Sequence, residues 1–305
     1  MLDRVTSMQI FVRIAAAGSF SAAARALGMS QTMATRHVDA IEERLGVRLL
    51  HRTTRRLTLT EAGRRYLEAC ERILGEIEEA EALTAAEHVE PRGTLRLNVP
   101  LSFGVREIAP VLPAFAAAHP RLTVDLGLAD RVVDLLEEGW DMAVRIGRLA
   151  ESSLVARRLA ACRMVLCAAP AYLAERGTPQ HTTDLARHNC LGYTLPGPAS
   201  AGSWAFGTQG QHVVAVAGNL RANNGDALVA AAVAGQGLVY QPSFLVSDAL
   251  RTGQLVPLAL EQPTDERLAV HAVLPPGRRP PAKTRAMVEF LADRFKPPPW
   301  DRDLP

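Results

Sequence analysis

The sequence is poor in cysteine. It holds four in 305 residues, Cys70, Cys162, Cys167 and Cys190, and no two have the C-x-x-C spacing of a zinc site or a dithiol motif. Buried thiols in a reducing compartment are the interpretation that we favour. The eight histidines add no ligand spacing to these cysteines, so we expect neither a metal ion nor a cofactor.

The sequence also has no apolar run of about 18 residues and no signal-peptide pattern at its N-terminus. These absences argue against a membrane protein and predict a cytoplasmic one. A hydrophobic content of 48% and a charged content of 22% are typical of a globular protein. A chain of this length is expected to form two or three domains, each large enough to bury a core.

The common enzyme motifs are missing as well. There is no G-x-S-x-G, no P-loop, no H-E-x-x-H and no G-x-G-x-x-G after a strand. The short Gly235-Gln236-Gly237 lies where a helix passes into a strand, which is the wrong place for a dinucleotide loop. We therefore expect a protein that is not an enzyme.

What the sequence does have is a strong segregation of charge. Residues 1–65 hold 11 arginines against 5 acidic residues, a balance of +6, whereas residues 66–90 hold 1 arginine against 8 acidic residues, a balance of −7. The whole chain carries only +2. A cationic module followed by an acidic helix is typical of a DNA-binding head on a dimerising stalk.

Residues 20–39 predict two short helices joined by a tight turn. Ser19 or Ser21 can cap the first helix, and Gly28 can end it because glycine takes a positive φ at no steric cost. Ser30 can cap a second helix over residues 31–45. An ordinary helical hairpin with a solvated polar face is one interpretation, and a DNA-binding helix-turn-helix is the other.

The second helix has two unlike faces. Four apolar residues recur with helical spacing, namely Ala34, Val38, Ile41 and Leu45. Four polar residues fall on or near the opposite face, namely Thr32, Thr35, Arg36 and Asp39. Short polar side chains followed by an arginine suit a helix whose first half lies against base edges in the major groove.

Two short apolar runs follow, at residues 47–50 and 57–59, and they flank the basic turn from His51 to Arg56. This pattern predicts a wing, which is a small β-hairpin whose tip arginines lie on the phosphate backbone.

With the wing in place, the N-terminal segment closely resembles the LysR-type transcriptional regulators. The resemblance is carried by AAAGSFSAAARALGMSQ and IEERLGVRLLHRTTRRLTLTEAG, without a gap over roughly sixty residues. It implies a winged helix-turn-helix whose DNA-binding residues are Ser30, Gln31, Thr32, Met33, Thr35, Arg36, Arg52, Thr53, Thr54, Arg55 and Arg56. At residues 32–35 Thr-Met-Ala-Thr replaces the commoner Pro-Ala-Val-Ser, which bears on base preference and not on the fold. Because some relatives sense oxidants, a redox pair such as Cys162 and Cys190 stays open.

Two further helices complete this half. Residues 4–17 predict a first helix with Val5, Met8, Val12 and Ala15 on one face. Thr60-Glu61 opens a long helix, to about residue 87, with an a/d seam of Tyr66, Cys70, Ile73, Ile77 and Ala80. A seam on a Glu-rich helix favours pairing with a second copy of the chain, and packing against the protein's own body is the alternative. We expect dimerisation through Tyr66, Cys70, Ile73 and Ile77, and the family resemblance implies homodimers and homotetramers.

Pro91-Arg92-Gly93 breaks the long helix, and strands and helices alternate after it. The expected order is a strand at 94–99, a helix at 105–118, a strand at 122–128, a helix at 132–138 and a strand at 142–146. Strands are then expected at 162–168, 238–240 and 268–273, and helices at 171–175, 227–234 and 283–294. This order implies open parallel sheets with helices on both faces, and a last segment that returns to the first lobe.

This half resembles the effector domain of the same family, which has two α/β lobes like a periplasmic binding protein. The stretches that carry the resemblance are PRGTLRLNVPLSFG, DRVVDLLEEGWDMAVRIG, SSLVARRLAACR, CAAPAYLAERGTP and LRANNGDAL. The fold class is thus α/β behind a winged helix-turn-helix. We divide the chain into a DNA-binding domain at 1–60, a linker helix at 61–90, an effector-binding domain at 91–296 and a loose Pro-rich tail at 297–305.

Ligands of such folds lie in the cleft between the lobes, beyond the carboxyl ends of the strands. That rule selects Ser102, Phe103, Asp130, Arg145, Gly147, Phe206, Asn223 and Asn224. Helix capping alone is the alternative for Ser102 and Asn224, and an ion pair with Asp141 or Asp130 is the alternative for Arg145. Two helix N-termini, an arginine and two phenylalanine walls favour a small organic effector with a carboxylate or another oxygen-rich group.

A sequence-specific, ligand-responsive transcription regulator of bacterial type accounts for these features together. It would bind promoter DNA as an oligomer, with RNA polymerase as a further partner that this function suggests. A secreted binding protein conflicts with the basic head. An architectural DNA binder has no use for about two hundred residues of two-lobed ligand fold.

Overall fold

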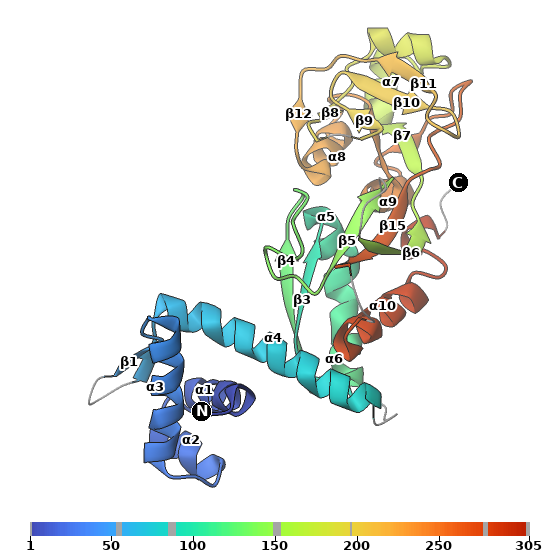
Figure 1. The fold of residues 1–305 in the computed structure, drawn as a ribbon. Helices are drawn as coiled ribbons and strands as arrows, with labels where there is room; N and C mark the ends of the chain where they lie inside the picture. The colour runs from blue at the N-terminus through green and yellow to red at the C-terminus, as the bar shows by residue number, and fades with distance from the viewer. Residues whose placement is uncertain are drawn as a thin grey trace. The chain divides into compact units, whose positions relative to one another are not determined.

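The computed structural model describes residues 2–52, 57–84, 90–148, 154–195, 197–276 and 280–302. The chain forms two compact units, Met1–Glu90 and Pro91–Pro305. Helices α1 to α4 and a small hairpin belong to the first unit, and the elements from β3 onward belong to the second (Figure 1). Each unit is described by itself.

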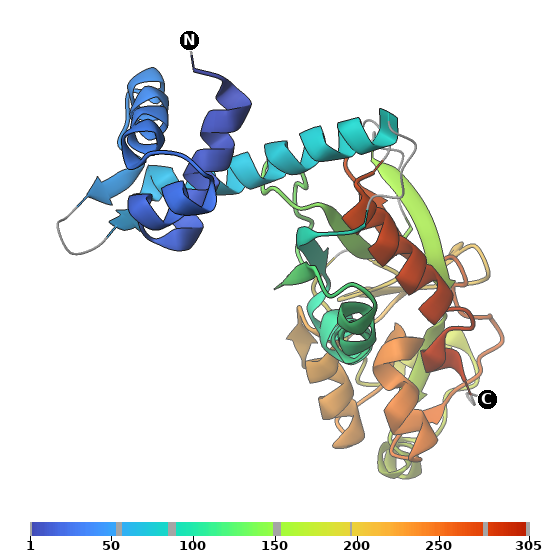
Figure 2. The same cartoon turned by 90° about the horizontal axis from the view of Figure 1, so that it is seen from below.

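The first unit is a helical domain with a two-stranded wing. Its elements are α1 Arg4–Ala17, α2 Phe20–Ala26, α3 Gln31–Leu45, β1 Leu50–Arg52, β2 Leu57–Leu59 and α4 Glu61–Thr84. Helices α1, α2 and α3 group round the start of α4 (Figure 2). The predicted caps are confirmed, because the hydroxyls of Ser19 and Ser30 accept backbone N–H groups of α2 and α3. Gly28 takes the expected positive φ, +66°.

The core of this unit differs from the apolar stripes that were predicted for α1 and α3. Helix α1 fully buries Ile10, Phe11 and Ile14, whereas the predicted face of Val5, Met8, Val12 and Ala15 is only half-buried, with Met8 and Val12 packed against the core. The reason is that α1 packs against three other helices, and its bulkiest side chains fill the space among them. On α3 the prediction holds for three residues but is wrong for Leu45, which is 41% exposed because α3 ends there at Gly46.

Close packing fixes the start of α4. The Thr60 hydroxyl accepts the Gly63 N–H at 2.9 Å and donates to the Arg48 carbonyl at 2.7 Å, so it caps the helix as predicted. A Cβ on Gly63 would lie 2.0 Å from the Leu49 carbonyl oxygen, so only glycine fits at this contact. The helix is therefore anchored to the wing at its first turn.

The second unit has two lobes. Lobe 1 contains β3 Gly93–Val99, β4 Leu122–Leu128, β5 Met142–Gly147, β6 Val155–Ala161 and β15 Ala269–Leu274, in the order β4-β3-β5-β15-β6 (Figure 1). Strand β3 is parallel to β4 and β5, but β15 is antiparallel to both of its neighbours. The sheet is therefore mixed and not parallel throughout, because the strand that returns from lobe 2 enters in the opposite direction.

One long helical segment follows β3 directly, four residues earlier than predicted. It consists of α5 Leu101–Phe103, the π-helix η1 Gly104–Ile108, the 3-10 turn η2 Ala109–Val111 and α6 Leu112–Ala118. Pro110 and Pro113 have no N–H to donate, so the α-helical ladder is interrupted and π and 3-10 turns replace it.

This segment also qualifies an expectation about apolar runs. Leu101–Ala118 has a mean hydropathy of 1.3 over 18 residues and is long and apolar enough to cross a membrane by length and composition alone. It buries Phe103, Ile108, Val111 and Phe115 in the core of the unit. A core helix passes the same test, and the burial favours that explanation.

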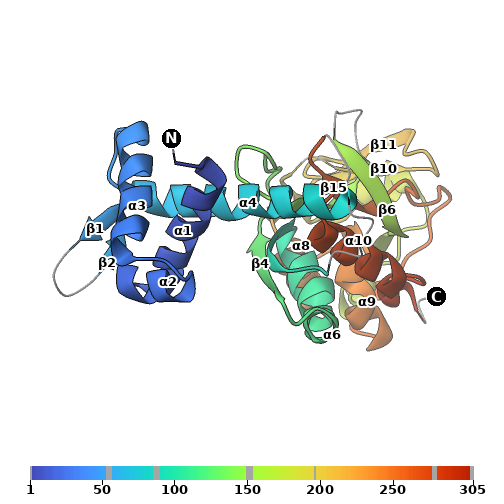
Figure 3. The same ribbon diagram turned by 60° about the horizontal axis from the view of Figure 1, so that its bottom comes forward.

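Helix α10 Ala282–Arg294 returns the chain to lobe 1 and packs against β3 and β6 (Figure 3). Its Lys283 ammonium lies 2.6 Å from the Asp141 carboxylate and donates to the Thr94 carbonyl at 2.7 Å. The pair joins α10 to the beginnings of β3 and β5.

Lobe 2 is built from two small sheets and four helical elements. One sheet has the order β13-β7-β14 and the other the order β11-β10-β9-β8-β12. The strands are β7 Met164–Ala168, β8 Gly192–Tyr193, β9 Ala199–Ser200, β10 Ser203–Phe206, β11 His212–Ala215, β12 Arg221–Ala222, β13 Val239–Pro242 and β14 Val256–Pro257. The helices are α7 Pro170–Arg176, η3 Thr182–Arg187, α8 Gly225–Val233 and α9 Ser243–Arg251.

Two chain crossings join the lobes, as predicted. One leads from β6 to β7 and the other enters β15, and the Cys162 N–H of the first donates to the Leu268 carbonyl of the second at 3.2 Å.

Two predicted segments are wrong. Residues 132–138 form no helix. Turns begin at Leu135, because the Asp134 carboxylate accepts the N–H groups of Leu136 and Glu137 and offers the backbone a local alternative. The described part of the tail, residues 297–302, is not loose. Trp300, in the 3-10 turn η4 Pro299–Asp301, is 1% exposed and packs against Phe103, because a large apolar ring gains most from burial.

Candidate DNA-binding surface and effector cleft

The recognition helix α3 presents its N-terminal half to solvent. Gln31, Thr32, Met33 and Arg36 are exposed, and Thr35 is half-buried. Arg36 forms no hydrogen bond or ion pair with any residue that the structure describes. The Ser30 hydroxyl caps the helix by accepting the Met33 N–H at 3.2 Å, so its oxygen already has a structural role.

Two buried polar contacts fix α3 from behind. His37 is 5% exposed, and its Nδ1 lies 2.8 Å from the Ser7 hydroxyl of α1. Glu42 is also 5% exposed, and its carboxylate accepts the Leu49 and Leu50 N–H groups at 2.8 and 3.1 Å. These two side chains on the buried side of α3 therefore hold the orientation of its exposed face, and the sequence pattern did not single out either one.

The wing has the predicted hairpin form. Strands β1 and β2 are antiparallel, with Leu50 opposite Leu59 and Arg52 opposite Leu57. The first strand begins at Leu50 and not at Val47, which is 46% exposed. The expected phosphate contacts at Thr53, Thr54, Arg55 and Arg56, and the side chain of Arg52, lie outside the described residues.

The seam of α4 divides into two parts. Cys70 is fully buried and Tyr66 is half-buried in the core of their own unit, and the Tyr66 ring lies 5.4 Å from that of Phe11. For Cys70 a dimer contact is therefore wrong, because α1 occupies the surface that a partner helix would need. Ile73 and Ile77 lie beyond this cluster and are half-buried. Dimerisation through them stays a prediction.

The predicted effector site lies where β3, β4 and β5 end, since parallel strands bring their carboxyl ends to one edge of the sheet. Ser102, at this edge of lobe 1, is 7% exposed. Asn224, in lobe 2, donates through Nδ2 to the Ser102 hydroxyl at 3.2 Å. Two predicted effector residues from opposite lobes thus meet directly.

Both helix N-termini at this edge already hold a side chain of the protein. The Asn224 amide oxygen accepts the Ala227 N–H at 3.2 Å and caps α8, so the capping alternative holds alongside the contact with Ser102. The Asp130 carboxylate accepts the Leu101 N–H at 2.9 Å. An anionic effector would therefore meet a negative charge at the first helix N-terminus.

Tyr193 is a residue near this edge that the sequence did not reveal. It ends β8, where it pairs with Ala222, just before the two asparagines. Burial and then the negative charge of Asp130 raise the pKa of the Tyr193 phenol to about 12, which places Tyr193 of lobe 2 near Asp130 of lobe 1. A two-residue strand is too short to show an alternating pattern, so only the presence of a tyrosine could have pointed to this position from the sequence.

The two predicted apolar walls are wrong. Phe103 is fully buried, and its ring makes edge-to-face contacts with Phe244, Phe295 and Trp300. Phe206 is fully buried as well and stacks on Tyr240 with ring centroids 4.9 Å apart. Both rings are core residues, because apolar segments distant in the sequence cover them.

The remaining predicted residues have other surroundings. Arg145 donates to the Val133 carbonyl at 2.9 Å, while Asp141 pairs with Lys283 and Asp130 caps a helix, so neither ion-pair alternative holds. Gly147 ends β5 with a φ of +149°. Asn223 is exposed beside Asn224.

The four cysteines are buried free thiols. Burial raises the pKa of Cys70 to about 11, and it raises the pKa of Cys162, Cys167 and Cys190 to about 12. Because the thiolate is the reactive form, these surroundings favour structural thiols over a redox pair.

Comparison with known proteins identifies both halves of the chain. The LysR substrate binding domain matches residues 88–296, and the bacterial regulatory helix-turn-helix protein, lysR family, matches residues 5–64. The transcriptional regulator CrgA of Neisseria meningitidis is 35% identical over 288 residues, which cover 94% of this chain and 96% of CrgA. A regulator of Xanthomonas campestris is 38% identical over 290 residues, 94% of this chain and 84% of its own.

The solved structure of CrgA covers 97% of this chain and 99% of its own, with a TM-score of 0.61 and 33% identity. The two family models divide the chain close to the boundary between its two compact units. The similarity thus extends over the basic head, the stalk and both lobes, and the chain belongs to the LysR family of transcriptional regulators, with an N-terminal DNA-binding domain and a C-terminal effector-binding domain.

Proposed function

We propose that this regulator reads promoter DNA with the exposed face of α3 and changes its DNA contacts when a small organic effector binds between Ser102 and Asn224. The observation that carries the proposal is the hydrogen bond between these two side chains, because it joins the lobes at the edge where such folds take their ligands. A ligand that replaces this bond would change how the lobes meet.

Base reading depends on Arg36, which lies on the exposed face of α3 with Thr32. Arg36→Ala should weaken specific operator binding by about 1–3 kcal/mol, which is roughly 5- to 150-fold in a gel-shift titration. Arg13→Ala is the matched control, since it removes an equal charge from an exposed site on α1. An equal loss of affinity for both variants would contradict base reading by Arg36.

The wing should hold the DNA backbone without base preference. Replacing Arg55 and Arg56 by alanine should weaken binding to operator and random DNA alike. It should also reduce the dependence of log K on log salt by about one unit for each lost phosphate contact. An unchanged salt slope would show that Arg55 and Arg56 do not contact the DNA phosphate backbone.

Dimerisation should use Ile73 and Ile77, the seam residues that the core of their own unit leaves free of α1. Ile73→Glu with Ile77→Glu places two charges in an apolar seam and should abolish the dimer in sedimentation. Arg72→Glu is the control, because it changes the charge of α4 at an exposed neighbouring position. A dimer that survives the double change would move the interface elsewhere. We expect tetramers to form by pairing of the dimers that Ile73 and Ile77 hold together.

The effector should carry a carboxylate together with a hydroxyl group. The hydroxyl of Ser102, the amide of Asn224 and the phenol of Tyr193 can each donate to a carboxylate, whereas Asp130 can accept from a ligand hydroxyl.

Thermal shift of the full chain against acetate, benzoate, lactate and malate tests this chemistry. A stabilising carboxylate should lose its effect in Ser102→Ala and Asn224→Ala and keep it in Thr123→Ala, an exposed position on β4. An inducer whose affinity neither cleft variant changes would refute the site.

We place the regulator in the cytoplasm with promoter DNA. Contact with RNA polymerase is tested by adding polymerase to the complex with operator DNA and measuring whether the complex migrates more slowly in a gel.

A further inference from the structure

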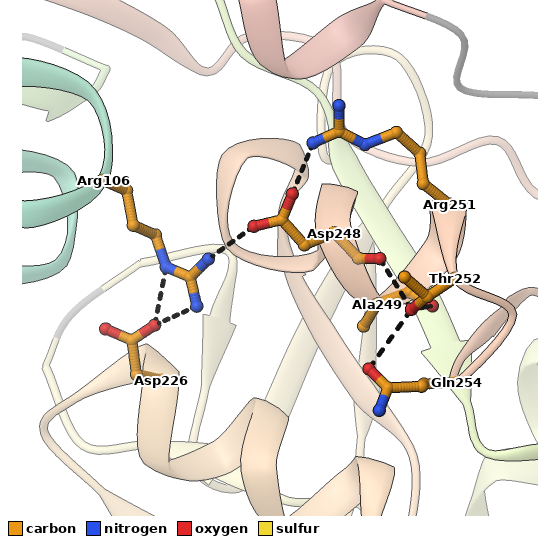
Figure 4. A network of polar contacts seen from close by, with 7 residues as sticks. All are labelled: Arg106, Asp226, Asp248, Ala249, Arg251, Thr252 and Gln254. Atoms are coloured by element: carbon orange, nitrogen blue, oxygen red, sulfur yellow. Dashed lines mark hydrogen bonds and ion pairs between the residues drawn. The ribbon is translucent and has the colours of Figure 1, made fainter. Parts of the chain in front are cut away.

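A second polar contact joins the lobes beside the bond between Ser102 and Asn224. Arg106 lies in η1 of lobe 1, and its Nε donates to the Asp226 carboxylate of α8 at 2.8 Å. Its Nη1 lies 3.3 Å from the Asp248 carboxylate of α9 (Figure 4). One guanidinium therefore links the long helix of lobe 1 to two helices of lobe 2.

This contact and the cleft contact hold the same two helix beginnings together. Arg106 follows Ser102 by four residues in one continuous helical segment, and Asp226 follows Asn224 by two residues in the first turn of α8. A movement of α8 as a rigid body away from this segment would therefore separate both pairs.

The backbone at Arg106 is irregular for a local reason. Pro110 cannot donate to the Arg106 carbonyl, and the π-helical turn of η1 closes with the Ala109 N–H on the Gly104 carbonyl. Such π turns inside longer helices occur frequently at functional sites. The irregular turn thus lies at the residue that bridges the lobes.

The charges of this network allow the contact to break and form again. Asp248 also pairs with Arg251 of its own helix and keeps that partner when Arg106 leaves. Asp226 stays in the first turn of α8, where the helix dipole stabilises a negative charge. The side chains of Arg106 and Asp226 are 29% and 39% exposed, so water can solvate both after separation. Opening therefore leaves neither Arg106 nor Asp226 as a buried charge without a partner.

We propose that Arg106 is a closure latch, a positioning residue whose ion pairs hold the lobes in the arrangement where Ser102 and Asn224 meet. The proposal rests on the proposed function only in taking that cleft as the effector site. Because an effector that contacts both lobes binds the closed form, its apparent affinity scales with the fraction of molecules that are closed. Arg106 then sets the sensitivity of the regulator without touching the effector.

The distance between the lobes tests the latch directly. Thr123→Cys on β4 and His212→Cys on β11 place exposed thiols on lobes 1 and 2 of the full chain. The four native thiols are buried and should remain unlabelled under native conditions. With nitroxide labels on both new cysteines, and labelled chains diluted into an excess of unlabelled ones, pulsed electron resonance gives the distance distribution within one chain.

The native chain should give a distribution dominated by the closed form, and Arg106→Met should lower the ratio of closed to open molecules by about fivefold, the scale of one partly exposed ion-pair network. Asp226→Asn, which keeps the side-chain shape, should act in the same direction. High salt should open the native chain but change Arg106→Met little. Arg251→Met is the matched control, since it removes a guanidinium from the same network inside lobe 2, and it should leave the distances unchanged.

A native distribution in both Arg106→Met and Asp226→Asn would overturn the proposal, and so would equal opening in Arg251→Met. If Arg106→Met does not fold, judged by circular dichroism, Asp226→Asn and the salt series decide the question. The distances are measured without effector. Failure of the latch is therefore separate from failure of the effector site, which is judged by Ser102→Ala and Asn224→Ala.

Discussion

Replacing Phe103 with alanine should destabilise the unit Pro91–Pro305 and leave the first unit unchanged. The ring is fully buried, and its centroid lies 5.1 Å from that of Phe244, 5.7 Å from that of Phe295 and 5.4 Å from that of Trp300. Truncation of a buried phenylalanine costs about 3–5 kcal/mol. Three lost aromatic contacts, at roughly 0.5–1.5 kcal/mol each, place the value toward the upper end of that range.

Differential scanning calorimetry of the full chain measures this loss. For a domain of this size 1 kcal/mol moves the midpoint by roughly 2–4 °C, so the transition of the second unit should fall by about 10–15 °C. The transition of the first unit should not move, because the two units have separate cores.

Val105→Ala is the matched control in the same helical segment. Val105 is 56% exposed, and its truncation should change the midpoint by less than about 2 °C. If Phe103 lined the cleft, as its position after β3 suggests, its truncation would weaken effector binding and cost little stability. A fall of less than about 3 °C would therefore refute the burial argument.

Three further predictions concern buried ionisable groups. Glu42→Ala removes the acceptor of the Leu49 and Leu50 N–H groups and should destabilise the first unit by about 2–4 kcal/mol in urea unfolding, whereas Glu42→Gln keeps an oxygen and should cost less than half as much. Equal losses would contradict this reason. Burial, and then the charge of Asp248, raise the pKa of Glu107, so its ionised form opposes folding. Glu107→Gln should therefore stabilise the second unit above the raised pKa, and the gain should disappear as the pH falls below the ordinary pKa of glutamate; a gain independent of pH would exclude ionisation as its cause. With thiol pKa values of about 11 to 12, fewer than about one native thiol in a thousand is ionised at neutral pH, so Ellman's reagent should react only as fast as the protein unfolds. Rapid reaction of the native chain would reopen the redox pair.

The first unit could be predicted almost residue by residue because its signals are local. Ser19, Ser30 and Thr60 cap helices through bonds to residues three positions away, and Gly28 needs only its own backbone freedom. The exposed face of α3 follows from helical periodicity alone. The buried side of α1 did not, because it depends on three helices that pack together.

In the second unit β3, β4, β5, β7, β13 and β15 carried enough pattern to be found, and β4 has the predicted bounds of Leu122–Leu128. The seven-residue strand β6 was missed. The two-residue strands β8, β9 and β12 have no periodicity, and α9 was not expected at all. The antiparallel direction of β15 could not be predicted from the sequence either, because the chain completes lobe 2 before it returns to lobe 1.

The sequence by itself determined the family, the N-terminal helix-turn-helix followed by a two-lobed domain, the exposed polar face of α3 and the parallel strands β3, β4 and β5, since these rest on local patterns. Only the tertiary structure decided which residues at the carboxyl ends of these strands face the cleft. Ser102 and Phe103 are neighbours, yet one meets Asn224 from 122 residues away and the other enters an aromatic core. The physical reason is that a side chain's surroundings are set by whichever distant segments cover it, and no spacing within the chain records that contact.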